Sequence, residues 1–217
     1  IEIGQHQEIF KKMKKKIIVI CGGGHGIACV DVIEKSKKYI IKGFVDSKKK
    51  SKNDLNGYKY LGDDKNLKKL RKNYKYALNG AGQIRNNTLR KKIFFKLKKN
   101  KFETPTIFSP NSIISKSAKL DEGTIIMHGV IINSKVNIGK NCIVNSKALI
   151  EHNVTIEEHC HISTGAIING NTTIKKNSFI GSGSIVGNGI KIGKNCIISA
   201  GSVITKDIKD GTFYKKK

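Results

Sequence analysis

The second half of the chain has an aliphatic residue at every sixth position. From Ile114 to Ile204 these positions hold only Ile, Leu or Val, sixteen times in succession and without a break in phase. Three residues after each aliphatic, Gly and Asn predominate, and both tolerate left-handed backbone well. The next position often carries a small residue. This period predicts short strands joined by tight corners, with one aliphatic side chain per strand pointing inward.

Three hexads make one turn of a triangular coil, so residues 18 apart stack on successive coils. Cys142, Cys160, Ser178 and Cys196 fall on one such column. We expect them to fill the interior rather than to bind a metal or to react. The repeat itself predicts a β-solenoid and leaves its handedness open.

The first part of the chain has a different pattern. A buried strand is predicted at residues 16–21, then a glycine-rich turn at 22–26, a helix from Ile27 to about Ser36 and a second strand at 39–46. A third strand at 76–79 and a helix at 87–99 follow. Glycines in such a turn let the backbone approach a phosphate, and the helix N-terminus favours an anion. Because Ile27 replaces the last glycine of G-x-G-x-x-G, a tight turn without a ligand stays an alternative.

Both prolines of the chain lie in residues 104–110, which predicts a linker. The predicted fold class is therefore α/β plus all-β. A small Rossmann-like N-terminal domain spans residues 17–108, and a β-helix spans residues 109–217. Because Met13 and the lysines after it resemble a native start, residues 1–16 are expected to be a mobile or non-native leader.

The charge changes this picture little. Lys and Arg number 42 against 16 acidic residues, giving a formal charge of +26. The lysines are scattered over both halves without an aromatic–basic cluster, so we expect a solvated basic surface and no nucleic-acid partner. Five cysteines without a C-x-x-C pair predict neither disulfides nor a zinc site. No membrane span or signal peptide is evident, which predicts a cytoplasmic protein without a membrane partner.

Four motifs in order carry a resemblance: GGGHG at 22–26, FVD at 44–46, NGAGQIR at 79–85 and IEH at 150–152. Over residues 17–208 the chain resembles the sialic acid O-acetyltransferase and UDP-amino-sugar N-acetyltransferase family of hexapeptide-repeat acyltransferases. The resemblance implies a left-handed parallel β-helix and a homotrimer with active sites between subunits. It also implies acetyl-CoA as co-substrate, a nucleotide sugar as acceptor, and no metal.

Position by position, the resemblance also implies site residues. His152 would be the general base, since imidazole has an unperturbed pKa of about 6.5 and suits removal of a proton from an attacking amine. Asn153 and Asn145 would belong to the same catalytic group. The substrate-binding residues would be Gly23, Gly24, His25, Asp46, Ser47 and Gly80. The acetyl-CoA contacts would come from His161, Gly181, Ser182 and Ala200.

Two features depart from the family. Asn153 stands where an acidic residue usually orients the base, so an Asn153 carbonyl, a backbone carbonyl or Glu151 would take that part. The chain ends in GTFYKKK at 211–217, a tail that we expect to be disordered. Among the other histidines, His159 at a corner is expected to be structural, and His128 has no assigned role.

The favoured function is N-acetylation of a UDP-4-amino-4,6-dideoxyhexose. O-acetylation of a sialic-acid-like sugar is the alternative within the family. A metal-dependent, carbonic-anhydrase-like β-helix using His152, His159 and His161 is a different enzyme class, for which the pattern offers no evident match. A non-catalytic nucleotide-binding module also stays open, because a fold by itself does not decide function.

Overall fold

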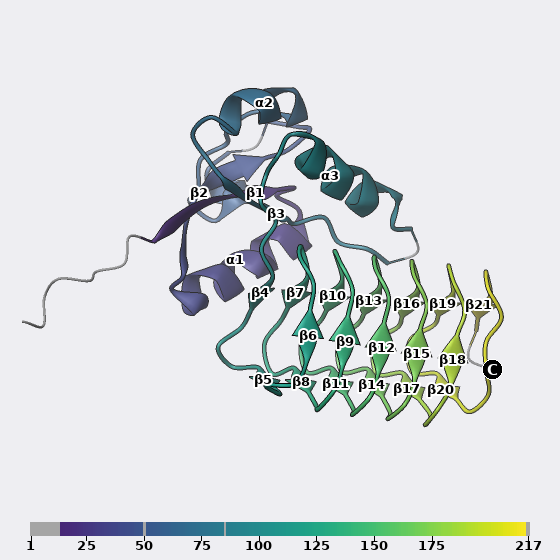
Figure 1. Ribbon diagram of the computed structural model, residues 1–217. Helices are drawn as coiled ribbons and strands as arrows, with labels where there is room; N and C mark the ends of the chain where they lie inside the picture. The colour runs from purple at the N-terminus through teal and green to yellow at the C-terminus, as the bar shows by residue number, and fades with distance from the viewer. Residues whose placement is uncertain (1–13, 50, 85, 216–217) are drawn as a thin grey trace, which may run out of the picture.

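The computed structural model describes residues 14–49, 51–84 and 86–215. A small α/β domain sits on the first coils of a long, three-sided β-helix (Figure 1). Its parallel sheet has the order β2-β1-β3. The strands are β1 (Lys15–Ile20), β2 (Tyr39–Val45) and β3 (Tyr76–Asn79). The first strand therefore lies in the middle, as in the predicted Rossmann-like unit.

Helices cover both faces of this sheet. Ile17 and Val19 of β1 face a core shared with α1, whereas Ile18 and Ile20 face the core that includes Leu97. Burial on both faces explains why this strand is a continuous apolar run. None of the described helices is long and apolar enough to cross a membrane. The helices are α1 (Gly24–Ser36), η1 (Asn53–Leu55), η2 (Asp64–Asn66), α2 (Leu67–Leu70) and α3 (Thr88–Lys99).

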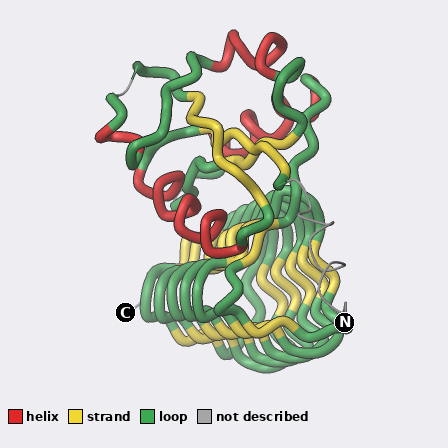
Figure 2. Tube along the Cα trace, turned by 90° about the vertical axis from the view of Figure 1, so that its left-hand side faces the viewer, coloured by secondary structure: helices red, strands yellow, loops and turns green. Residues whose placement is uncertain are grey.

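The rest of the chain winds as a left-handed parallel β-helix with a triangular cross-section (Figure 2). Its seven-stranded side contains β4 (Ile107–Phe108), β7 (Ile125–Ile126), β10 (Ile143–Val144), β13 (His161–Ile162), β16 (Phe179–Ile180), β19 (Ile197–Ile198) and β21 (Phe213–Tyr214).

The six-stranded side contains β5 (Ile113–Ile114), β8 (Ile131–Ile132), β11 (Leu149–Ile150), β14 (Ile167–Ile168), β17 (Ile185–Val186) and β20 (Val203–Ile204). The five-stranded side contains β6 (Lys119–Leu120), β9 (Asn137–Ile138), β12 (Thr155–Ile156), β15 (Thr173–Ile174) and β18 (Lys191–Ile192). From β5 to β21 the second residue of each strand points inward, whereas Phe108 of β4 is exposed.

The register confirms the 18-residue coil. Ile143 pairs with His161, and His161 pairs with Phe179 one coil further on. The inward aliphatics from Ile126 to Ile204 are buried in one continuous core, and Ile114 with Leu120 packs against its open end. The column of Cys142, Cys160, Ser178 and Cys196 is buried within the coil, as interior filler should be.

Corners adopt the predicted left-handed backbone, even where the residue is not Gly or Asn. His159 has φ of 60° and Lys147 also has φ of 60°. The last coil departs from the pattern, because Phe213 pairs with Ile197 only sixteen residues earlier. Gly211, with φ of 74°, then takes the corner conformation that the hexad phase would give to Phe213, two residues later.

The ends of the elements differ from prediction in four places. Residues 1–13 of the expected leader lie outside the described residues, but Lys15 and Lys16 belong to β1. α1 begins at Gly24, three residues earlier than predicted. β4 pairs with β7, so coiling begins at Ile107, inside the expected linker. The tail predicted to be disordered instead forms β21, because Phe213 and Tyr214 continue the ladder of β19.

The two parts share a core. Ile125, Met127 and Ile143 of the first coils pack in the same cluster as Val30 and Ile33 of α1. The N-terminal domain is thereby fixed over the seven-stranded side, and this contact decides which edge of the prism lies near the glycine-rich turn.

Candidate active site

The glycine-rich turn lies between β1 and α1. Gly23 is the N-cap of α1 and provides no side-chain cap, and no acidic residue lies in the first helical turn. Gly23 and Gly24 have open space where a side chain would project. A Cβ at Gly26 would lie 2.0 Å from the Cys21 carbonyl oxygen, so this close approach of helix and strand requires glycine. Backbone N–H groups and the helix dipole therefore face a space suited to a phosphate.

Asp46 follows β2 and holds this turn. Its carboxylate accepts a hydrogen bond from the Gly22 N–H at 2.7 Å. The exposed Ser47 hydroxyl lies 3.3 Å from the other carboxylate oxygen. Gly80 is buried, and its N–H donates to the Ile20 carbonyl at 2.7 Å, so it packs between strands and shapes the turn from below.

Two predicted site histidines come together beneath the turn. The Nδ1 of His161 hydrogen-bonds the main-chain carbonyl of Gln83, in the segment after β3. His25 Nε2 lies 3.5 Å from the Cys29 thiol. Burial, with the charges of Arg90 and His161, lowers the pKa of His25 to about 3. Burial likewise lowers the pKa of His161 to about 4, so both rings are neutral near pH 7.

Cys29 and His25 have the spacing of a nucleophile and its base, yet the thiol is not activated. Burial raises the pKa of the Cys29 thiol to about 12. A reactive cysteine needs a thiolate in an electropositive, accessible place. The pair is therefore structural.

The charge behind these low histidine pKa values belongs to Arg90. Its guanidinium is completely buried and donates to the main-chain carbonyls of Asn79 at 2.9 Å, Ala81 at 2.7 Å and Asn141 at 3.1 Å. It thus joins the N-terminal domain to a corner of the β-helix. Sequence reasoning missed this residue, although it shares the buried face of α3 with Phe94 and Leu97.

The remaining predicted residues lie on the edges of the prism. The first edge, between the seven- and six-stranded sides, carries Asn145, Gly181, Ser182 and Ala200. The second edge, between the six- and five-stranded sides, carries His152 and Asn153. The third edge leads back to the seven-stranded side and carries His159. Within one chain, the predicted acetyl-CoA residues therefore share the first edge with Asn145, whereas His152 stands on another edge.

Small residues shape the first edge. A Cβ at Gly181 would lie 2.5 Å from the Ala200 nitrogen, so successive coils meet closely there. The hydroxyl of exposed Ser182 lies 2.9 Å from the Ser163 hydroxyl. Asn145 accepts from the Ser146 N–H at 2.8 Å. His161 lies in β13, the strand that leads into this edge, and its Nε2 is buried without a hydrogen-bond partner among the described residues.

His152 is exposed, and its ring lies against Gly170 of the next coil. A Cβ at Gly170 would be 2.7 Å from His152 Cε1, so only glycine leaves room for this ring position. The Asn153 Nδ2 lies 3.1 Å from His152 Nδ1 and also donates to Asn171 Oδ1 at 3.2 Å. The expected Asn153 carbonyl is thus replaced at the ring by the amide nitrogen, because Asn171 holds that amide in place. Since an amide nitrogen only donates, Nδ1 accepts and the neutral ring carries its proton on Nε2.

Comparison with known proteins adds to this geometry. Residues 16–97 match the family model described as PglD N-terminal domain. Residues 126–214 match the model described as GMPPB C-terminal domain. No curated protein matches the chain.

Solved structures match over nearly the whole length. The acetyltransferase domain of PglB from Neisseria gonorrhoeae, in complex with acetyl coenzyme A, is 28% identical with a TM-score of 0.85, covering 91% of this chain and 94% of that one. A His-to-Asn mutant of perosamine N-acetyltransferase from Caulobacter crescentus, in complex with CoA and GDP-perosamine, is 27% identical with a TM-score of 0.83, covering 90% of each chain. WeeI from Acinetobacter baumannii, 23% identical with a TM-score of 0.80, covers 91% of this chain and 95% of that one and shares the fold.

The chain is an acetyltransferase, and the family-model match together with these solved structures supports the hexapeptide-repeat sugar acetyltransferase family. It has the predicted fold class, with a Rossmann-like domain ahead of a left-handed β-helix.

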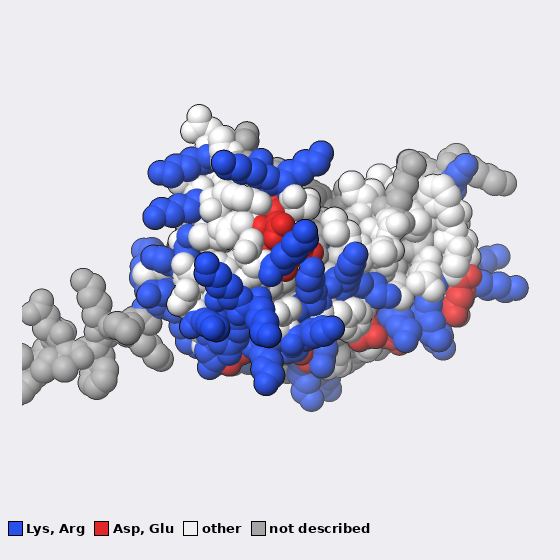
Figure 3. Space-filling model, turned by 90° about the horizontal axis from the view of Figure 1, so that it is seen from above, with Lys and Arg blue, Asp and Glu red and all other residues white. Residues whose placement is uncertain are grey.

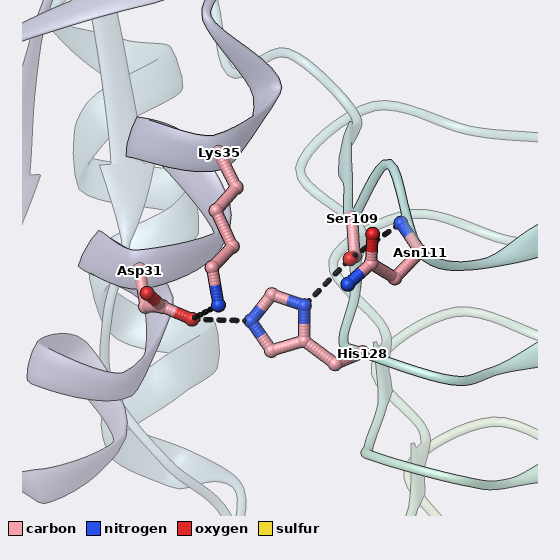
Figure 4. A network of polar contacts seen from close by, with 5 residues as sticks. All are labelled: Asp31, Lys35, Ser109, Asn111 and His128. Atoms are coloured by element: carbon pink, nitrogen blue, oxygen red, sulfur yellow. Dashed lines mark hydrogen bonds and ion pairs between the residues drawn. The ribbon is translucent and has the colours of Figure 1, made fainter.

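His128, which had no role assigned from its position in the repeat, links the two parts of the acetyltransferase (Figure 4). Its Nε2 lies 2.6 Å from Asp31 Oδ2 of α1, and its Nδ1 lies 2.6 Å from the Ser109 hydroxyl. Ser109 accepts from the Asn111 N–H at 3.0 Å, so its own hydrogen goes to His128 Nδ1. The arrangement resembles a Ser–His–Asp triad in composition only, since the Ser109 side chain is buried and already engaged.

His159 fits the expected structural role. It lies between the rings of Phe94 and Phe95 of α3, and Asn141 approaches its Nδ1 at 2.9 Å. Burial lowers its pKa to about 4. Within the described part of one chain, no three His, Cys, Asp or Glu side chains gather so as to hold a metal ion.

The acetyltransferase is basic over much of its surface. Viewed from the side of the N-terminal domain, Lys and Arg side chains spread widely, with a few acidic side chains between them (Figure 3). Such a field attracts anionic small ligands as well as polyanions, so the charge alone selects no partner.

Proposed function

We propose that this acetyltransferase moves an acetyl group from acetyl-CoA to the amino group of a nucleotide-linked amino sugar, with a UDP-4-amino-4,6-dideoxyhexose as the first candidate. The observation that carries the proposal is the state of the histidines. His159 and His161 are buried, His25 is half-buried, and all three are neutral, while both ring nitrogens of His128 are engaged. His152 is the exposed one among the described histidines, so its ring is accessible to a bound substrate.

The acceptor's nucleotide would bind at the glycine-rich turn. The diphosphate would lie over Gly23 and Gly24 at the N-terminus of α1, where N–H groups and the helix dipole favour negative charge. Asp46 and Ser47 would hold the nucleoside, and His25 would line the path toward the β-helix. Because His25 is neutral, it would donate or accept a hydrogen bond without contributing charge.

Acetyl-CoA would lie along the first edge. Ser182 and Ala200 are exposed there on successive coils, and their small side chains leave the backbone accessible. His161 Nε2 would meet the thioester end, which gives this buried unpaired atom a partner. The CoA crystallised with the Caulobacter relative supports this part of the proposal.

The complete site would form between subunits. The outward residues of the six-stranded side are all aliphatic, and Ile113 and Val203 are 68% and 57% exposed. The five-stranded side instead presents Lys, Asn and Thr outward. An apolar stripe of this kind marks a protein contact. Because the first and second edges border this stripe, packing it in a homotrimer would bring His152 of one subunit to the first edge of another.

The chemistry follows from this arrangement. The amine nitrogen attacks the thioester carbonyl carbon, a C–N bond forms, and the C–S bond breaks to release CoA. His152 takes the proton that the nitrogen loses, and that proton passes to the departing sulfur. Backbone N–H groups would stabilise the oxyanion of the intermediate. For Nε2 to accept the proton, Nδ1 must carry the ring hydrogen, which requires the Asn153 carbonyl to turn toward it.

The test compares two neighbouring substitutions, His152→Asn and Asn153→Asp. Thiol release from acetyl-CoA is measured with UDP-, dTDP- and GDP-linked amino sugars and with CMP-sialate. His152→Asn should lower kcat by about a hundredfold or more while acetyl-CoA still binds. Asn153→Asp should raise kcat by up to about tenfold, because a carboxylate accepts from Nδ1–H and frees Nε2. Its pH–rate profile should shift to higher pH at the acid limb.

Two controls complete the test. Mixing His152→Asn with an inactive Gly24→Glu variant, followed by subunit exchange, should restore part of the activity if sites lie between subunits. Near-normal turnover by His152→Asn would remove His152 from the mechanism. Turnover on CMP-sialate alone would replace N-acetylation by O-acetylation.

A further inference from the structure

A polar pocket lies between the segment after β3 and the third edge of the β-helix. Its volume is about 140 Å³. Two isoleucines and Phe179 provide its apolar surface. The rest of its described lining consists of amide side chains: Gln83, Asn86, Asn87, Asn177 and Asn195.

Three of these amides have a buried atom without a hydrogen-bond partner: Gln83 Oε1, Asn87 Nδ2 and Asn177 Oδ1. Gln83 is only 3% exposed, and its Nε2 donates to the His159 carbonyl at 3.1 Å, which leaves its oxygen unused. A buried polar atom without a partner costs about 1–3 kcal/mol. Three such atoms around one pocket indicate that a ligand completes their hydrogen bonds.

Asn87 provides an independent indication. It is the N-cap of α3, a position where Asn normally accepts from a backbone N–H of the first turn. Here its side chain makes no capping hydrogen bond. The Asn87 side chain instead lines the pocket, so α3 lacks a side-chain N-cap hydrogen bond at the residue that provides an amide to the pocket.

The lining also defines the ligand's charge and size. None of the described lining residues is charged, in a chain with 42 Lys and Arg residues. Among these described residues a ligand therefore meets amide groups rather than a counter-charge. The volume lies below the roughly 300–1,000 Å³ of sites that enclose drug-sized ligands, so it suits a single ring rather than a nucleotide or CoA. Hydroxyl groups both donate and accept, and they satisfy amide oxygens and amide nitrogens equally.

We propose that this pocket binds the hexose ring of the acceptor, with the amides on its hydroxyls and Phe179 against its apolar face. The proposal rests on the proposed function. It also places the ring next to the reaction, because the Phe179 ring meets the His161 ring edge-on at 5.2 Å and the Gln83 carbonyl holds His161. Gln83 therefore connects the sugar pocket to the residue expected at the thioester.

The test removes one amide without disturbing the corner that carries it. Asn177 has φ of 66°, the conformation that Gly165 and Gly183 adopt at other corners, so Asn177→Gly keeps the backbone. Lys135→Gly, at an exposed corner with φ of 57°, is the matched control. Binding of the UDP-linked amino sugar, UDP and acetyl-CoA is measured by calorimetry. Asn177→Gly should weaken the sugar nucleotide about tenfold and leave UDP and acetyl-CoA unchanged, and Lys135→Gly should change none.

Other outcomes overturn the proposal. An equal loss for UDP would place the nucleotide in the pocket, a loss for acetyl-CoA would place the pantetheine arm there, and no loss would leave the pocket without the sugar. Thiol release by the unaltered protein tests the proposed function separately. If no nucleotide sugar is acetylated, saturation-transfer NMR with a free 4-amino-4,6-dideoxyhexose decides the pocket: a signal lost in Asn177→Gly supports it, and no signal refutes it.

Discussion

Gly170 controls the position of His152. The backbone of Gly170 lies outside the left-handed region, so alanine fits the fold there, but its Cβ would lie 2.7 Å from His152 Cε1. We expect Gly170→Ala to displace the imidazole and to lower kcat by about tenfold to a hundredfold, with the KM for acetyl-CoA and the melting temperature little changed. Steady-state kinetics and thermal melts measure these effects. A His152→Asn/Gly170→Ala double variant should be no slower than His152→Asn alone, and an additive loss would mean that Gly170 acts elsewhere.

For single residues, the position in the six-residue repeat predicted the environment of a side chain better than the residue type did. Apolar residues occupy the position of His161 on the other coils of the seven-stranded side, and the structure places His161 buried beneath the N-terminal domain. The burial of Arg90 could not be predicted, because α3 is rich in lysine and its sequence does not distinguish one buried cation from several exposed ones. The orientation of the Asn153 amide was also not predicted, since it depends on a hydrogen bond to Asn171, which is 18 residues away in the sequence. Hydrogen bonds between coils are not visible in a local motif.

At the scale of elements, His128 fastens α1 to the first coils. His128→Phe keeps a ring of similar shape but loses both hydrogen bonds, and it leaves the buried Ser109 hydroxyl without its acceptor. We expect a loss of about 2 kcal/mol, equivalent to about 4–8 °C in melting temperature for a chain of this size. Lys35→Met, which breaks only the half-exposed ion pair with Asp31, should cost less than about 1 kcal/mol. Equal melting temperatures for the two variants would show that His128 does not fasten the parts.

The period of six predicted the coils because each hexad obeys one rule of burial and one of backbone conformation. It failed only where the rule changes. The last coil is shortened, so β21 falls out of phase with the hexads and looked like a tail. β4 stands before the first hexad that was counted, and proline residues around it suggested a linker. A strand of two residues is too short to be predicted from its own sequence. It is defined by its pairing with a strand on the next coil.

At the scale of the whole molecule, one subunit holds apart the residues that the proposed reaction would bring together. The N-terminal domain covers the seven-stranded side and brings the glycine-rich turn close to His161, whereas His152 stands on the second edge. The motifs on the chain gave the residues of both groups. The motifs could not give the distances between these two groups, because those distances depend on how the β-helix winds and on which edge each residue falls. The aliphatic outward residues of the six-stranded side, from Ile113 to Val203, are the sequence signal for the proposed contact between subunits.

Three buried histidines make the stability of the molecule depend on pH. His25, His159 and His161 have folded-state pKa values lowered to about 3, 4 and 4, against about 6.5 in the unfolded chain. Between these values the unfolded chain binds more protons than the folded one, so stability is complete above about pH 6.5 and falls as pH falls. We expect a loss of up to about 2 kcal/mol per histidine between pH 7.5 and pH 5, measured by urea unfolding at fixed protein concentration.

His159→Asn isolates one of these contributions. Asn occupies the same left-handed corner conformation at Asn141, Asn177 and Asn195, so the substitution removes the titrating ring and keeps the backbone. The variant should be less stable than the unaltered protein at pH 7.5, because Phe94 and Phe95 lose their contact with the ring. Its further loss on going to pH 5 should be smaller by up to about 2 kcal/mol, since one fewer buried base must be protonated on unfolding. An unchanged loss between the two pH values would show that His159 is already protonated, or already open to solvent, in the folded protein.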